Sequence, residues 1–77
     1  MSKREAILEI LSKIRPSVDY ENAQGILENG LLDSLEFLNL ISELGSHFGV
    51  EIGIDEITVE NFDTIETIEK MVQRIEG

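Results

Sequence analysis

The sequence has no cysteine, and it has only one histidine and one proline among its 77 residues. Without cysteine the chain can form neither a disulfide nor a zinc–thiolate site, and it has no thiol nucleophile of its own. Any chemistry that needs a thiol must therefore take its sulfur from a prosthetic group.

The sequence also lacks a long apolar run. Its apolar stretches are all much shorter than a membrane span, and its first residues mix charged and apolar side chains in a way that does not resemble a secretory signal. We therefore expect a cytoplasmic protein that is not stably inserted in a membrane.

Basic residues are scarce, with 6 Lys and Arg against 16 Asp and Glu, so the net charge is −10. This balance disfavours nucleic acids and anionic membranes as partners and favours proteins with basic surfaces. The charge is uneven, because residues 1–15 hold 4 basic and 2 acidic side chains whereas residues 16–77 hold 2 basic and 14 acidic ones. The negative charge therefore belongs to the chain that follows residue 15.

The length predicts a single domain over residues 1–77. A core of this size supplies only a few kcal/mol of net stability. We therefore expect every apolar helix face to be needed for folding.

Local signals predict a first helix over residues 3–15. Ser2 and Glu5 make a capping box, and apolar residues recur at three- and four-residue spacing from Ala6 to Ile14. Pro16 then forbids continuation of the helix.

A second helix is predicted over residues 34–48. Asp33 is a suitable N-cap, and Glu36 three residues later completes a capping box. Gly45 inside this helix indicates close packing against a neighbour, and Gly49 after it indicates a C-cap. The apolar surface of the helix is wide enough for a central position in the core.

The segment between these helices, residues 16–32, has no sustained period and is expected to form a long loop. Gly30 is expected to have a positive φ angle. Apolar residues are expected to pin the loop across the helices: Val18, Tyr20, Ile26, Leu27, Leu31 and Leu32.

The last third of the chain predicts an extended connector and two helices. The connector, residues 50–54, is expected to bury Val50, Ile52 and Ile54. A short third helix is expected between residues 55 and 62, with Ile57, Val59 and Phe62 turned inward. Asp63 with Glu66 is expected to cap a final helix that ends at Gly77. The sequence therefore predicts an all-α fold, a small four-helix bundle with a long first loop and a short third helix.

Ser34 is the candidate functional residue. It falls at the first position of the second predicted helix, directly after the Asp33 N-cap. A phosphoryl group esterified to this serine would lie beside unpaired backbone N–H groups at the positive end of the helix dipole. The position therefore suits a phosphodiester.

Several stretches around this serine resemble the acyl carrier protein family, which includes the peptidyl and D-alanyl carriers. The matching stretches are GLLDSL at residues 30–35, residues 36–48, VEI at residues 50–52 and FDTIETI at residues 62–68. In that family a 4'-phosphopantetheine arm is attached to the serine of an Asp-Ser-Leu motif. The resemblance covers most of the chain, matches least over residues 16–29, and implies a bundle of the acyl-carrier type.

The resemblance implies that this chain is a substrate and not an enzyme. A phosphopantetheinyl transferase would move the arm from coenzyme A onto the Ser34 hydroxyl, with magnesium on the transferase side and Asp33 orienting the complex. The thiol of the arm would carry an acyl or aminoacyl group as a thioester, and the tether would raise its local concentration at each partner active site. A monomer is expected.

Partner recognition is then expected on acidic and apolar side chains near the second helix. The candidate residues are Leu35, Glu36, Glu43, Glu56 and Glu60. Surface ion pairs of ~0.2–1 kcal/mol each suit rapid association and release. For each of these carboxylates, simple solvation is an equally good explanation.

Two kinds of cargo stay open on the sequence. Residues 30–34 look like those of D-alanyl carriers and of many stand-alone carriers in specialised pathways, whereas fatty-acid carriers more often have a different pair before Asp-Ser-Leu. A specialised acyl or aminoacyl carrier therefore competes with a fatty-acid or polyketide carrier.

Other chemistry has weaker support. Glu51, Asp55, Glu56 and Glu60 could bind a divalent cation loosely, but no segment has the order of an EF-hand loop, so no metal site is predicted. The lone histidine, His47, is near a predicted helix end, where a surface role is more common than catalysis.

A competing hypothesis is a small acidic helical adaptor that binds a basic protein partner without modification. It predicts that Ser34 can be replaced by alanine without loss of function.

Overall fold

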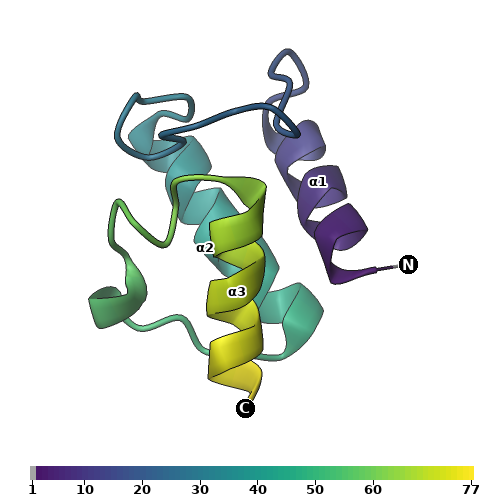
Figure 1. Cartoon of the computed structure of the whole chain (residues 1–77), viewed down its shortest axis with the longest axis vertical. Helices are drawn as coiled ribbons and strands as arrows, with labels where there is room; N and C mark the ends of the chain where they lie inside the picture. The colour runs from purple at the N-terminus through teal and green to yellow at the C-terminus, as the bar shows by residue number, and fades with distance from the viewer. Residues whose placement is uncertain (1) are drawn as a thin grey trace.

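The computed structural model describes residues 2–77, which form three α-helices and one 3₁₀ turn (Figure 1). The elements are α1 (Lys3–Ile14), α2 (Ser34–Phe48), the 3₁₀ turn η1 (Ile54–Glu56) and α3 (Ile65–Glu76). A long loop joins the end of α1 to the start of α2, and a second irregular segment containing η1 joins α2 to α3. The all-α prediction is confirmed, but the described residues hold three α-helices and not four.

Helix α1 forms as its local signals predict, and it ends one residue earlier than expected. The Ser2 hydroxyl accepts from the Glu5 N–H at 3.1 Å, and the Glu5 carboxylate accepts from the Ser2 N–H at 3.0 Å. At the other end, the C-cap is Arg15, whose N–H donates to the Leu11 carbonyl at 2.9 Å. Pro16 follows directly and cannot continue the helix.

Helix α2 has the predicted bounds. Gly49 caps its C-terminus in the left-handed region with φ 64°, and Gly30 in the preceding loop also has a positive φ of 64°, as expected. A Cβ on Gly45 would lie 3.0 Å from the Val50 carbonyl oxygen, so this glycine does permit a close approach.

Replacing Gly49 by alanine is expected to destabilise the fold by roughly 1–2 kcal/mol, because an L side chain in the left-handed region costs about that much. Nothing lies within 4 Å of the new Cβ, so the cost is confined to the backbone. Urea unfolding measures it as a lower midpoint. Gly49→Asn should lose less, since asparagine tolerates this region. An unchanged midpoint in Gly49→Ala would contradict this role of the cap.

The prediction of a short third helix between residues 55 and 62 is wrong, because only η1 forms before an irregular run of turns. Side chains there compete with the helical pattern: the Thr58 hydroxyl accepts from the Asn61 N–H at 3.1 Å, and the Asn61 amide donates to the Glu56 carbonyl at 2.8 Å. The two β-branched residues Thr58 and Val59 also disfavour a helix. Phe62 is fully buried as expected, whereas Val59 is exposed.

The extended connector after α2 is also less buried than predicted. Val50 and Ile52 are half-buried, but Ile54 is 89% exposed. Ile54 begins η1, and this turn directs it away from the core. The expectation that Ile54 is buried is therefore wrong.

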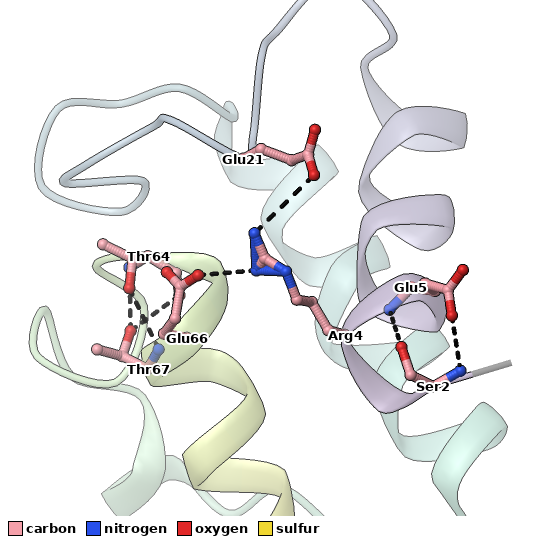
Figure 2. Close-up of polar contacts among 7 residues, drawn as sticks. All are labelled: Ser2, Arg4, Glu5, Glu21, Thr64, Glu66 and Thr67. Carbon is pink, nitrogen blue, oxygen red and sulfur yellow. Dashed lines mark hydrogen bonds and ion pairs between the residues drawn. The ribbon is translucent and has the colours of Figure 1, made fainter.

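The cap of α3 differs from the predicted pair Asp63 and Glu66. Thr64 is the N-cap, its hydroxyl accepts from the Thr67 N–H at 3.2 Å, and the Thr67 hydroxyl accepts from the Thr64 N–H at 3.0 Å (Figure 2). The Asp63 carboxylate instead accepts from the Gly25 N–H of the long loop at 2.6 Å. Asp63, which local spacing assigned to the cap, is therefore engaged by a residue distant in the sequence.

The core draws on all three helices and on both irregular segments. Its fully buried side chains with the largest volumes are Phe62, Ile7, Leu11, Ile26, Leu40, Leu44, Ile65, Ile68, Met71 and Val72. The long loop is pinned as predicted, because Tyr20, Ile26 and Leu32 are buried and the others are partly buried against the core. Two backbone bonds also tie the loop to the segment before α3, from Ile26 N to Asp63 O at 3.1 Å and from Leu27 N to Phe62 O at 3.0 Å.

Three of the four basic side chains of residues 1–15, those of Lys3, Arg4 and Arg15, form ion pairs with the rest of the chain, whereas Lys13 pairs with Glu9 inside α1. Lys3 lies 2.7 Å from Glu76. Figure 2 shows the pairs of Arg4, which lies 2.7 Å from Glu66 and 3.9 Å from Glu21. These contacts join α1 to both ends of α3 and to the long loop. Most of the positive charge of residues 1–15 is thus engaged in ion pairs within the molecule. No helix within residues 2–77 is both long and apolar enough to cross a membrane.

Candidate functional site

Ser34 is the first residue of α2, and it is exposed. The N-cap Asp33 has an extended backbone, and its carboxylate accepts from the Glu36 N–H at 2.8 Å. The Glu36 carboxylate accepts in return from the Asp33 N–H at 2.9 Å. The predicted capping box is therefore present, and it encloses Ser34.

The start of α2 offers backbone donors beside the serine. The Glu36 N–H donates to the Asp33 carboxylate, and the Phe37 N–H donates to the Asp33 carbonyl at 2.8 Å. The N–H groups of Ser34 and Leu35 precede the first intrahelical bond and have no carbonyl partner within the helix. A negatively charged phosphoryl group on the Ser34 oxygen would lie close to these donors and to the positive end of the helix dipole.

A shallow, mainly apolar groove of about 430 Å³ begins at Ser34. Its lining residues are Leu27, Leu32, Asp33, Ser34, Phe37 and Leu38. The Phe37 ring packs edge-on against the buried Phe62 ring, with the ring centroids 4.9 Å apart.

No histidine lies near Ser34 to act as a general base. His47 is in the last turn of α2, roughly 20 Å along the helix axis from Ser34 at 1.5 Å per residue. Its ring packs edge-on against Phe48, with the centroids 4.7 Å apart. His47 is therefore too far from Ser34 to act as its general base.

Arg15 reaches the same helix start and is a feature that the sequence analysis missed. Its guanidinium contacts the Glu36 carboxylate through Nε at 3.1 Å and Nη2 at 2.9 Å. The hydrogen bond to Glu36, followed by the charge of that carboxylate, raises the pKa of Arg15 above its ordinary value. The buried Tyr20 hydroxyl donates to the Arg15 carbonyl at 2.8 Å, and burial raises the pKa of Tyr20.

The five residues predicted to bind partners fall into two groups. Leu35 is 69% exposed, and Glu43 and Glu60 are also exposed. Glu36 and Glu56 are instead engaged within the chain, since Glu36 pairs with Arg15 and Glu56 lies 2.8 Å from Arg74. The structure also exposes apolar side chains that were not predicted as partner residues: Leu38, Ile54 and Val59.

The acidic residues considered for loose cation binding do not form a metal centre. Within residues 2–77, no group of three or more His, Asp or Glu side chains is arranged to hold a metal ion. Glu56, one of the four, accepts from the Asn61 amide in addition to its pair with Arg74.

Comparison with known families gives the decisive observation. The model of the phosphopantetheine attachment site family matches residues 5–75, which is nearly the whole chain and includes the capped start of α2. The chain belongs to this family. It is thus a phosphopantetheine carrier protein, and the group that it carries is a covalently attached 4'-phosphopantetheine. The exposed hydroxyl, the backbone donors and the groove at the start of α2 fit such a group.

Three curated relatives of this carrier protein are D-alanyl carrier proteins. This chain is 35% identical over 63 residues to the D-alanyl carrier protein of Lacticaseibacillus casei, an alignment that covers 79% of this chain and 78% of the relative. It is 32% identical over 78 residues to that of Leuconostoc mesenteroides, covering 100% of this chain and 96% of the relative. It is 30% identical to that of Enterococcus faecalis, with 99% and 100% covered. No solved structure matches the chain.

Proposed function

We propose that Ser34 carries the 4'-phosphopantetheine arm and that residues 1–77 act as one carrier domain. The observation that supports this most is the position of Ser34, an exposed hydroxyl at the first residue of a capped helix within the matched span. Backbone N–H groups at this position favour the phosphodiester that the attachment creates. The arm supplies the terminal thiol that this cysteine-free chain lacks.

In the attachment reaction the Ser34 hydroxyl is the acceptor. Its oxygen forms a bond to the phosphorus of coenzyme A that bears the pantetheine arm. The bond from that phosphorus to the nucleotide part breaks, and the hydroxyl proton leaves to a base of the transferase or to water. Asp33 is proposed to orient the transferase and its magnesium, because its carboxylate is fixed by the capping box directly before the serine.

We propose D-alanine as the first cargo to test. Relatives aligned over nearly their whole length are D-alanyl carrier proteins. An aminoacyl group on the thiol would be loaded by an adenylating ligase and passed on by partner enzymes. Other acyl or aminoacyl groups, including those of fatty-acid and polyketide pathways, are the alternative outcomes. A monomeric state and a cytoplasmic location stay predictions from the sequence.

The partner surface is proposed to use those of the five candidate residues that the fold leaves exposed. Leu35 follows Ser34 directly and is exposed, and Glu43 and Glu60 are exposed carboxylates without an ion pair among residues 2–77. Glu36 and Glu56 would have to exchange an internal ion pair for an external one. They are therefore expected to contribute less than the three exposed residues.

The test of the attachment is the intact mass of the protein after incubation with coenzyme A, magnesium and a broad-specificity phosphopantetheinyl transferase. We expect a gain of one phosphopantetheinyl group, located by peptide fragmentation on Ser34. No gain, or a gain on another residue, would contradict the proposal.

The cargo is tested on the modified protein with ATP, a D-alanine-activating ligase and either D-alanine or L-alanine. The expected result is a thioester with D-alanine that hydroxylamine cleaves. Loading by an acyltransferase or a different adenylating enzyme, without loading of D-alanine, would overturn the cargo and leave the attachment intact.

A further inference from the structure

Arg15 lies at the junction between the end of α1 and the start of α2, and both its backbone and its side chain are held. Its N–H donates to Leu11 O at 2.9 Å, and its carbonyl accepts from the Tyr20 hydroxyl at 2.8 Å. Its guanidinium forms a two-pronged contact with Glu36, at 3.1 Å and 2.9 Å. Such a two-pronged contact, or fork, attracts the charge of the carboxylate and also fixes its orientation.

The carboxylate that Arg15 holds is the one that closes the capping box around Ser34. Glu36 Oε1 accepts from the Asp33 N–H at 2.9 Å and also lies 2.9 Å from Arg15 Nη2. Asp33 and Glu36 bring two negative charges to one helix start, and like charges repel at this range. The positive charge of Arg15 offsets this repulsion, and only the fold places it there.

We propose that Arg15 is a positioning residue for the modification of Ser34. It holds Glu36, and through Glu36 it holds the backbone and carboxylate of Asp33 in the arrangement that the transferase meets. Arg15 acts through Glu36 and not by contact with the reacting atoms. The inference rests on the proposed function, in which Ser34 is the attachment site.

Positioning and surface charge act on different kinetic constants. Removing Arg15 makes the carrier one unit more negative, which by itself would strengthen the attraction to a basic transferase and lower KM. Loss of positioning instead lowers kcat, because the Ser34 hydroxyl is aligned for attack in a smaller fraction of the bound complexes. The two effects can therefore be separated in one experiment.

Arg4 offers a matched control for Arg15. It also makes a close ion pair, at 2.7 Å to Glu66, and its side chain is 33% exposed compared with 41% for Arg15. It lies about 16 Å away along α1 at 1.5 Å per residue. Arg4→Gln therefore removes the same charge and a similar contact at the opposite end of α1 from Arg15.

The experiment measures kcat and KM of the transferase for wild type, Arg15→Gln, Arg15→Lys and Arg4→Gln. We expect kcat to fall about tenfold in Arg15→Gln with KM unchanged or lower. Arg15→Lys keeps the charge but loses the fork, so its kcat should be intermediate. Arg4→Gln should stay within about twofold of wild type in kcat, as a distant surface pair is worth little.

Hydrogen exchange gives a second readout that does not need the transferase. The amides of Glu36 and Phe37, which the cap holds, should exchange faster in Arg15→Gln and at the wild-type rate in Arg4→Gln. Equal kcat in Arg15→Gln and wild type, or an equal fall in Arg4→Gln, overturns the positioning role alone. If wild type itself is not modified on Ser34, the proposed function fails and the role of Arg15 fails with it.

Discussion

Replacing Ser34 by alanine is expected to abolish phosphopantetheine attachment completely. The substitution removes the hydroxyl oxygen that is proposed to accept the phosphoryl group, and neither a neighbouring backbone group nor a carboxylate can form the same ester. Alanine is a good helix former, and Ser34 is exposed, so the free energy of unfolding should change by no more than ~0.5 kcal/mol. The lost modification therefore cannot be attributed to unfolding.

Intact mass after incubation with coenzyme A and the transferase measures this effect, with circular dichroism as the check on folding. Ser46→Ala is the matched control, because Ser46 is an exposed serine of the same helix α2. It should be modified at the wild-type rate. A mass gain that persists in Ser34→Ala would place the attachment elsewhere, and full function of Ser34→Ala in the cell would favour the unmodified adaptor.

Replacing Phe62 by alanine is expected to destabilise the fold by ~3–5 kcal/mol, which is the usual cost of truncating a buried aromatic side chain. Phe62 has no exposed surface, and its ring packs edge-on against Phe37 at 4.9 Å between centroids. Its carbonyl accepts from the Leu27 N–H at 3.0 Å, so the same residue anchors the long loop. A small domain has little more net stability than this to lose, and much of the protein should be unfolded.

Urea unfolding followed by circular dichroism measures the loss through the midpoint. Val59→Ala is the control from the same segment, since Val59 is 43% exposed, and it should change the free energy of unfolding by ~0.5 kcal/mol or less. Phe62→Leu, which keeps part of the buried volume, should lie between the two. A wild-type midpoint in Phe62→Ala would mean that this segment is not part of the cooperative core.

Helices α1 and α2 could be predicted from the sequence, because their boundaries depend on local contacts. The capping boxes of α1 and α2 each join residues three positions apart, and Gly49 ends α2 through its own backbone conformation. The position of Ser34 at the start of α2 follows from the Asp33 cap alone. This local chemistry is sufficient to place an exposed serine at a capped helix start, and the proposal that it is the attachment point rests in addition on the family resemblance.

The segment between α2 and α3 could not be predicted in the same way. The side chains of Thr58 and Asn61 bond to nearby backbone groups and replace the expected helix with turns. The Asp63 carboxylate accepts from the N–H of Gly25, a residue 38 positions away in the sequence, and does not cap α3 as expected. Thr64 is the N-cap of α3. Such outcomes depend on which distant groups folding brings within reach.

The sequence by itself determined the helical class, the acidic surface and the serine at a capped helix start, because composition and contacts within four residues fix these features. Only the tertiary structure decided that Arg15 meets Glu36, 21 positions away, and that Glu36 and Glu56 are occupied by internal ion pairs. The physical reason is that the free energy of such contacts is available only after the apolar faces have packed and placed the ends of the helices side by side.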